Sequence, residues 1–106
     1  MRVAKLDEMM KGWFVGGFQP AAYSTEACEV AVKYYSASDR EALHRHLVAT
    51  EITLVLFGSI RMAGRECSKG DIVVLSPGEA TDFEAVTECA TVVVKVPGAL
   101  NDKYLL

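Results

Sequence analysis

The chain lacks several features that mark whole classes of protein. No apolar run approaches the roughly 18 residues that a membrane-spanning helix requires. Residues 1–11 are polar and charged, which predicts no secretory signal peptide. The 11 basic and 14 acidic residues are mixed along the sequence without a basic block. We therefore expect neither a membrane nor a nucleic acid as a partner.

Cysteine is scarce, and its pattern does not indicate a disulfide framework. Cys28, Cys67 and Cys89 are odd in number and show no CxxC spacing. Such usage is typical of reduced, partly buried thiols in a cytoplasmic protein. Disorder is not expected, because 51% of the residues are apolar. The length of 106 residues predicts one domain, spanning residues 1–106, with a single hydrophobic core.

Histidine is rarer still, and the only two histidines are His44 and His46. In a strand, both imidazoles would point to the same face, because side chains alternate with a period of two. Glu51 follows five residues after His46. Two imidazoles and a carboxylate form a ligand set that first-row divalent metals accept. The alternative is that the histidines only form hydrogen bonds inside a polar pocket, with Glu51 making a local contact.

Short apolar segments separated by turn residues fill most of the chain, which is typical of an antiparallel sandwich or barrel. The expected strands are 28–35, 51–57, a hairpin of 60–62 with 65–67, 71–75, 81–85 and 90–96. Residues 12–18 predict an edge strand whose aromatic side chains cover an open end of the barrel. Only residues 38–43 suggest helix, as a single turn with Ser38 as its N-cap.

The run His44-x-His46-x4-Glu51-x6-Gly58 resembles the first motif of the cupins. The family pattern has a glycine six residues before the first histidine, and Ser38 stands at that position here. The resemblance implies that His44, His46 and Glu51 hold a divalent metal such as iron, manganese, nickel or zinc.

A partial second cupin motif follows. Gly70 and Gly78 fall on its two glycine positions, but Ser76 replaces its proline and Thr81 replaces its histidine. Threonine offers a neutral oxygen, which is a poor ligand for a soft or borderline metal. The resemblance therefore implies a three-ligand site whose remaining positions are open to water or substrate.

The resemblance also implies the fold. It places the first motif at about 38–58 and the second at about 70–85, and the tail at 96–103 is similar to that of small single-domain cupins. The implied architecture is all-β, a double-stranded β-helix or jelly-roll barrel with little or no helix. Such a barrel encloses a small pocket between its sheets.

Several other side chains are candidates for binding a ligand in that pocket: Tyr35, Thr53, Arg61 and Thr81. Tyr34 and Tyr35 cannot both point inward, because they are adjacent on one strand. A cation such as Arg61 or Lys33 would suit a carboxylate or phosphate. The alternating pattern of half-buried strands instead favours Lys33 and Arg61 as solvent-facing residues.

Two classes of function remain open at this point. One is a metal-dependent isomerase, lyase or oxygenase acting on a small polar metabolite. The other is a non-catalytic module that binds a small ligand and has a degenerate metal site. Open edge strands and small size favour a homodimer. Trp13 and Phe14 are expected to serve packing or that dimer contact rather than a substrate.

Overall fold

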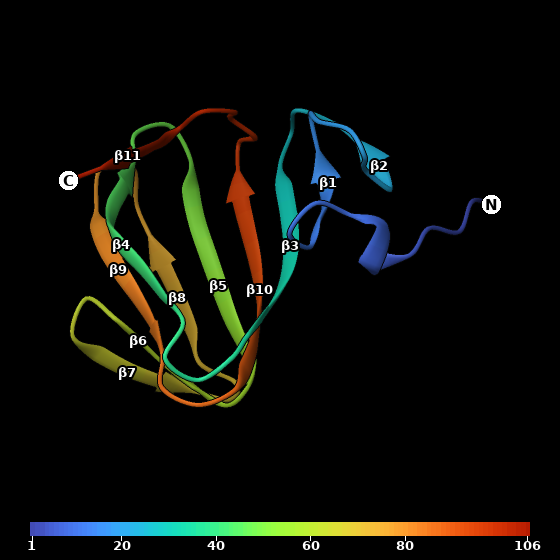
Figure 1. Cartoon of the computed structure of the whole chain (residues 1–106). Helices are drawn as coiled ribbons and strands as arrows, with labels where there is room; N and C mark the ends of the chain where they lie inside the picture. Colours follow the sequence, from blue (N-terminus) through green and yellow to red (C-terminus); the bar gives the residue numbers. More distant parts are fainter.

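Two β-sheets face each other across the interior of the molecule (Figure 1). The computed structural model describes all 106 residues. The six-stranded sheet has the order β2-β1-β3-β10-β5-β8, and the five-stranded sheet has the order β11-β4-β9-β6-β7. The strands of the first sheet are β1 (Trp13–Gly16), β2 (Tyr23–Ser24), β3 (Glu29–Tyr35), β5 (Thr50–Phe57), β8 (Ile72–Leu75) and β10 (Cys89–Val96). Those of the second are β4 (Arg40–His46), β6 (Ser59–Met62), β7 (Arg65–Ser68), β9 (Ala80–Ala85) and β11 (Lys103–Leu105).

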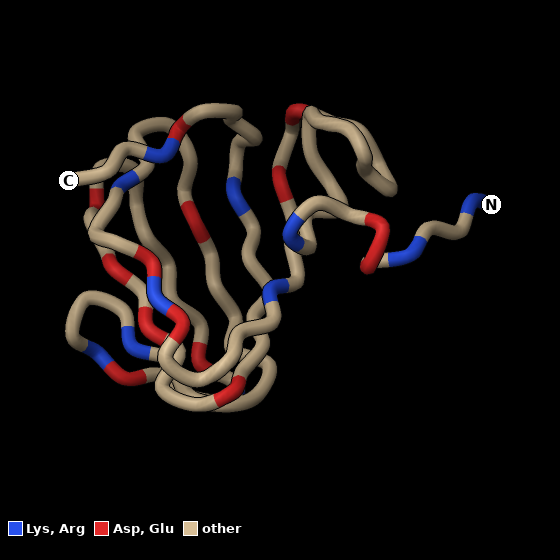
Figure 2. Tube along the Cα trace, viewed as in Figure 1, with Lys and Arg blue, Asp and Glu red and all other residues tan.

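The all-β prediction is confirmed, with helix limited to a single 3₁₀ turn at Leu6–Glu8. No helix in the structure has the length and apolar character needed to cross a membrane. The predicted hairpin forms from β6 and β7, and its two turn residues, Ala63 and Gly64, have φ angles of 50° and 77°. Positive φ at both positions is what a tight two-residue hairpin turn requires. Basic and acidic positions are scattered over both sheets without a continuous stripe of either sign (Figure 2).

The helical turn expected at residues 38–43 is wrong, because this segment begins β4 instead. Ser38 has a φ of 78°, whereas a helix N-cap has extended backbone. A hydrogen-bonded turn precedes the strand: the Ser36 N–H donates to the Asp39 carboxylate at 2.8 Å, and the Asp39 N–H donates to the Ser36 carbonyl at 3.1 Å. Antiparallel pairing of β4 with β9 then supplies backbone partners that a six-residue helix could not match.

Residues 12–18 were expected to form an edge strand, and this is wrong in one respect. The strand β1 lies between β2 and β3, so the two-residue β2 forms the edge. The aromatic residue Trp13 does reach the cavity between the sheets, as expected for a side chain that covers an open end.

The interior is divided into an apolar half and a polar half. The apolar half is a cluster that includes Val55, Ile60, Phe83 and Cys89. The polar half begins on β3, where the residues facing inward are Glu29, Ala31, Lys33 and Tyr35, and Tyr34 points outward with 69% of its surface exposed. Opposite this polar half lie the two histidines of β4, so the fold assembles a polar cavity at one end of the barrel.

Candidate metal centre

His44 and His46 come from the five-stranded sheet, and Glu51 comes from the six-stranded sheet. The ligand atoms of these three side chains all lie within 4.8 Å of one another. The Nε2 atom of His46 is 3.5 Å from Oε2 of Glu51, and the two imidazole rings stand edge to face with centroids 5.5 Å apart. The structure therefore brings together the three residues that the first motif singles out.

The hydrogen bonds of both imidazoles orient their free nitrogens. The Nδ1–H of His44 donates to the Ala42 carbonyl at 2.7 Å, and the Nδ1–H of His46 donates to the Asp102 carbonyl at 3.0 Å. A carbonyl oxygen only accepts, so each Nδ1 carries the proton and each neutral ring keeps a lone pair on Nε2. Burial lowers the pKa of His46, and the charge of Lys95 lowers it further. His46 is thus held in the neutral form that a metal requires.

Glu51 completes the cluster with an atom that has no hydrogen-bond partner. Its Oε2 is fully buried and receives no hydrogen bond, and only 12% of the whole side chain is exposed. Leaving a carboxylate oxygen buried without a partner is costly, and a cation beside it would remove that cost. The orphaned oxygen and the two Nε2 lone pairs together fit a divalent metal ion.

Asp102 positions this cluster from the far end of the sequence, and the sequence analysis missed it. Its carboxylate accepts hydrogen bonds from the backbone N–H groups of Leu47, Val48 and Ala49 at 3.0 to 3.1 Å. Burial by itself would raise the pKa of Asp102, but these backbone hydrogen bonds outweigh it and hold the pKa below its usual value. Asp102 therefore fixes the turn that follows His46 as well as the His46 ring.

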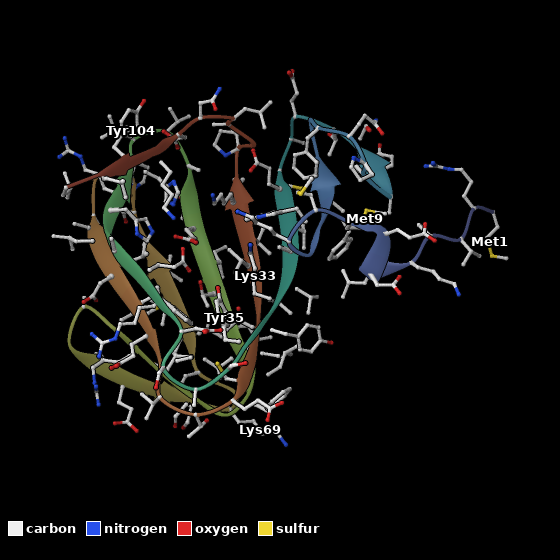
Figure 3. All side chains as sticks on the ribbon, in the orientation of Figure 1. Met1, Met9, Lys33, Tyr35, Lys69 and Tyr104 are labelled. Carbon is white, nitrogen blue, oxygen red and sulfur yellow. The ribbon has the colours of Figure 1, made fainter.

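A cavity of about 1150 Å³ opens beside the three residues. It is lined by side chains from both sheets and from the N-terminal segment, and Figure 3 shows Lys33 and Tyr35 pointing from β3 toward the interior. The Tyr35 hydroxyl donates to Oε2 of Glu41 at 3.2 Å, and the Lys103 ammonium donates to Oε1 of the same carboxylate at 3.1 Å. Burial, with the charge of Glu41, raises the pKa of Tyr35, so its phenol keeps its proton.

The other predicted ligand-binding residues do not line the cavity. Thr53 and Thr81 are buried, and Thr81 pairs with His44 in the register of β4 and β9 while its hydroxyl donates to the Asp82 carbonyl at 2.7 Å. Arg61 lies outside the cavity, and its guanidinium pairs with Glu84 at 2.8 Å and with Glu66 at 3.6 Å. Of the four candidates, the structure places only Tyr35 against the cavity.

Four lysines line the cavity, Lys11, Lys33, Lys95 and Lys103, and two of them, Lys33 and Lys95, are partly buried. Lys33 was expected to face solvent, and this is wrong, because burial is sufficient to lower the pKa of its ammonium group. Lys95 was missed altogether. The Nζ atoms of Lys33 and Lys95 lie 5.1 Å and 4.9 Å from the centroid of the Trp13 ring. A signal was present, because Lys95 is the only charge in an otherwise apolar strand and shares the inward face with Val93.

No protein-family model matches this chain, and no curated protein matches it either. Solved structures do match. The DMSP lyase DddQ from Ruegeria pomeroyi has a TM-score of 0.72 at 19% identity, covering 88% of this chain and 49% of that one. This chain thus spans about half the length of the lyase.

Two further similar structures bear on the fold. An uncharacterised protein with a double-stranded β-helix domain from Klebsiella pneumoniae has a TM-score of 0.69 at 20% identity, covering 96% of this chain and 93% of that one. The oxalate decarboxylase of Bacillus subtilis, described with Mn(II) centres, has a TM-score of 0.65 at 19% identity, covering 77% of this chain and 25% of that one. At these identities the likeness shows a shared fold.

Proposed function

This chain has the cupin fold, a double-stranded β-helix, and from this premise we propose that it binds a divalent metal through His44, His46 and Glu51. The metal would act together with a small polar metabolite held in the adjoining cavity. The observation that carries the proposal is the buried, unpartnered Oε2 of Glu51, which lies 3.5 Å from the Nε2 of His46. Iron, manganese, nickel and zinc all accept this donor set.

The chemistry of such a site follows from its open positions. A bound metal would supply Lewis acidity that polarises a carbonyl or carboxylate of the ligand. The chain itself supplies a phenol, Tyr35, whose hydroxyl donates a hydrogen bond to Glu41 in the same cavity. A lyase and a decarboxylase with Mn(II) centres are among the similar structures. They support lyase chemistry as one form of this function, beside isomerase and oxygenase chemistry.

A non-catalytic binding module is the second candidate, and one observation favours it. The residue at the position of the second-motif histidine is Thr81, which is buried outside the cavity with its hydroxyl donating to a backbone carbonyl. Asp82, next to it, offers no replacement, because its carboxylate accepts the Ala63 N–H at 3.0 Å. A site with three protein ligands holds a metal less tightly than one with four.

Metal analysis tests the proposal directly. Protein purified without chelator is analysed for bound elements, and chelator-stripped protein is titrated with Mn²⁺ and Zn²⁺ by calorimetry. We expect one metal per chain, and we expect His46→Ala and Glu51→Gln to abolish binding. Asp82→Asn is the matched control, because this carboxylate is engaged elsewhere and its loss should leave metal binding intact. An absence of binding in the unaltered chain would overturn the metal proposal and favour the binding module.

We further propose that the chain forms a homodimer, through a face other than the N-terminal segment. Trp13 is turned into the cavity, whereas the outer face of the six-stranded sheet is apolar. The register of β3, β5, β8 and β10 places several exposed apolar side chains on this one face: Tyr34, Leu56, Ile72, Val74 and Val96. The face ends at β8, whose outer edge has no strand partner. A second copy would cover both the apolar face and that edge.

Light scattering coupled to size-exclusion chromatography tests the dimer at micromolar concentration. We expect a dimer that becomes a folded monomer when Ile72 and Val74 are both replaced by glutamate. Leu100→Glu is the control, because Leu100 is an exposed apolar residue outside the strands. A monomer before substitution, or a dimer that survives it, would contradict the proposal.

A further inference from the structure

Two partly buried cations in the cavity have no ion-pair partner. Lys33 on β3 and Lys95 on β10 both line the cavity, and neither takes part in any ion pair of the structure. Both are partly buried, and burial is the largest cause that lowers the pKa of Lys33. A buried ammonium group without a counter-ion is destabilising. These two groups are therefore placed where an anion entering the cavity would meet them.

The position of Lys95 is especially informative. In the register of β10 and β5 it lies directly opposite Glu51, where cross-strand Cβ atoms are about 5 Å apart. An ion pair between the two would be the simplest arrangement. Instead the Lys95 ammonium lies 4.9 Å from the centroid of the Trp13 ring, and the Glu51 oxygen stays unpartnered beside His46. The cation is thus next to the candidate metal ligands but directed away from them.

The remaining carboxylates of the cavity are already engaged or lie at its exposed mouth. Glu41 receives hydrogen bonds from Tyr35 and Lys103. Asp39 receives the Ser36 N–H. Asp7 is exposed and forms no ion pair. Glu29, opposite Lys95 in the register of β3 and β10, accepts the Ala99 N–H at 2.8 Å. The charge of Glu41 acts on Lys33, but no carboxylate forms an ion pair with Lys33 or Lys95.

We propose that Lys33 and Lys95 bind the carboxylate of a small organic acid next to Trp13, beside His44, His46 and Glu51. This inference rests on the proposed function, because a second oxygen of the same acid would bind the metal held by His44, His46 and Glu51. Two separate ammonium groups are point charges that suit a carboxylate. Phosphate sites commonly add a helix N-terminus or a row of backbone N–H groups, and the only helical element here is a three-residue turn.

Trp13 makes the proposal directly measurable, because it is the only tryptophan in the chain. The centroid of its ring lies 5.1 Å from the Nζ of Lys33 and 4.9 Å from the Nζ of Lys95. Sodium succinate is titrated into the full chain at constant ionic strength, and the Trp13 emission is followed with and without Mn²⁺. Succinamide, a neutral probe of similar shape, and inorganic phosphate are titrated in parallel. We expect saturable succinate binding, with succinamide and phosphate at least about tenfold weaker.

Substitutions then locate the binding. Lys33→Met and Lys95→Met keep the apolar stem of each side chain and remove the charge, and each should weaken succinate binding by about tenfold, the loss expected for one charge-assisted contact. Lys33→Gln and Lys95→Gln provide a second pair in case a methionine variant fails to fold. Lys69→Met is the matched control, since Lys69 is an exposed lysine in the turn before β8 and lies outside the cavity (Figure 3).

The outcomes separate this inference from the metal proposal. Succinate binding that is unchanged in both lysine variants, or equalled by succinamide or phosphate, overturns the carboxylate site even if metal binds. An absence of succinate binding overturns it as well, and leaves the two lysines as packing against Trp13. Lysine-dependent succinate binding in a chain that takes up no metal supports the carboxylate site and overturns the metal proposal alone.

Discussion

Asp102 supports His46 through two different groups. Its backbone carbonyl accepts the Nδ1–H of the imidazole at 3.0 Å, and its carboxylate accepts the backbone N–H groups of the three residues that follow His46. His46 and Asp102 are 56 positions apart in sequence, and they meet because β11 pairs with β4. The orientation of one candidate metal ligand therefore depends on the C-terminal segment.

The first prediction concerns this contact. Asp102→Ala leaves three backbone N–H groups without their acceptor, one of them on the fully buried Ala49. Hydrogen bonds to a charged group contribute about 1.5–3 kcal/mol, so we expect the free energy of unfolding to fall by about 3 kcal/mol. Urea denaturation of the native chain and the variant measures this difference in the free energy of unfolding. Asp71→Ala is the control, because its carboxylate accepts a single exposed N–H from Ser68 and its loss should cost about 1 kcal/mol or less. Equal losses in both variants would contradict the assignment.

The second prediction is the response of stability to acid. The pKa of Asp102 is lower in the folded chain than its ordinary value of 3.8, because the backbone hydrogen bonds outweigh burial. A carboxyl whose folded pKa is depressed contributes stability above its unfolded pKa, and that contribution is lost as the pH falls through the folded pKa. The free energy of unfolding should therefore fall steeply below about pH 4. In Asp102→Asn the same measurement from pH 6 to pH 2 should give a flatter curve, and an unchanged curve would contradict the prediction.

The third prediction concerns two positions of the first motif with left-handed backbone. Ser38 has a φ of 78° and Gly58 has a φ of 79°. Glycine adopts this conformation without strain, so Ser38→Gly should stabilise the chain by about 0.5–1 kcal/mol. Gly58→Ala should destabilise it by more than about 1 kcal/mol, because a Cβ there would clash with the Glu88 carbonyl oxygen. Denaturant midpoints check both, and a destabilised Ser38→Gly variant would refute the argument.

The fourth prediction links metal binding to stability. A metal that binds only the folded chain adds about 2.7 kcal/mol at a free concentration 100 times its dissociation constant. We expect Zn²⁺ or Mn²⁺ to raise the melting temperature and a chelator to reverse the change. His46→Ala should remove the response. A melting temperature that rises equally in His46→Ala would place the metal elsewhere.

The fifth prediction concerns the residue at the position of the missing histidine. Thr81 lies opposite His44 in the register of β4 and β9, and its side chain faces the interior. Thr81→His should add a fourth ligand and tighten metal binding by about tenfold or more, where tenfold corresponds to about 1.4 kcal/mol. Thr81→Val is the matched control and should leave the metal affinity unchanged, because the native hydroxyl is engaged with the Asp82 carbonyl. Calorimetric titration compares the three chains, and weaker binding by Thr81→Val would show that the hydroxyl is itself a ligand.

Local sequence predicted much of the sheet structure for physical reasons that act over a few residues. The β-branched run of β5 and β10, and the Ala63-Gly64 turn between β6 and β7, specify extended segments and a tight reversal without help from the rest of the chain. The period of two likewise placed His44 and His46 on one face. Residues 38–43 were misread because their helical tendency is weak, and pairing of β4 with β9 outweighs it.

The sequence by itself therefore determined most of the strands, though not β2, β4 or β11, together with the tight turns and the shared face that the two histidines would have in a strand. Only the tertiary structure decided what surrounds them. Packing of the two sheets brought Glu51 to His46, and pairing of β11 brought Asp102 to the same ring. The tertiary structure also turns Lys33 and Lys95 inward against Trp13, while valines of the same sheet face outward. Alternation states which residues share a face, but only the position of the opposing sheet decides which face becomes the interior.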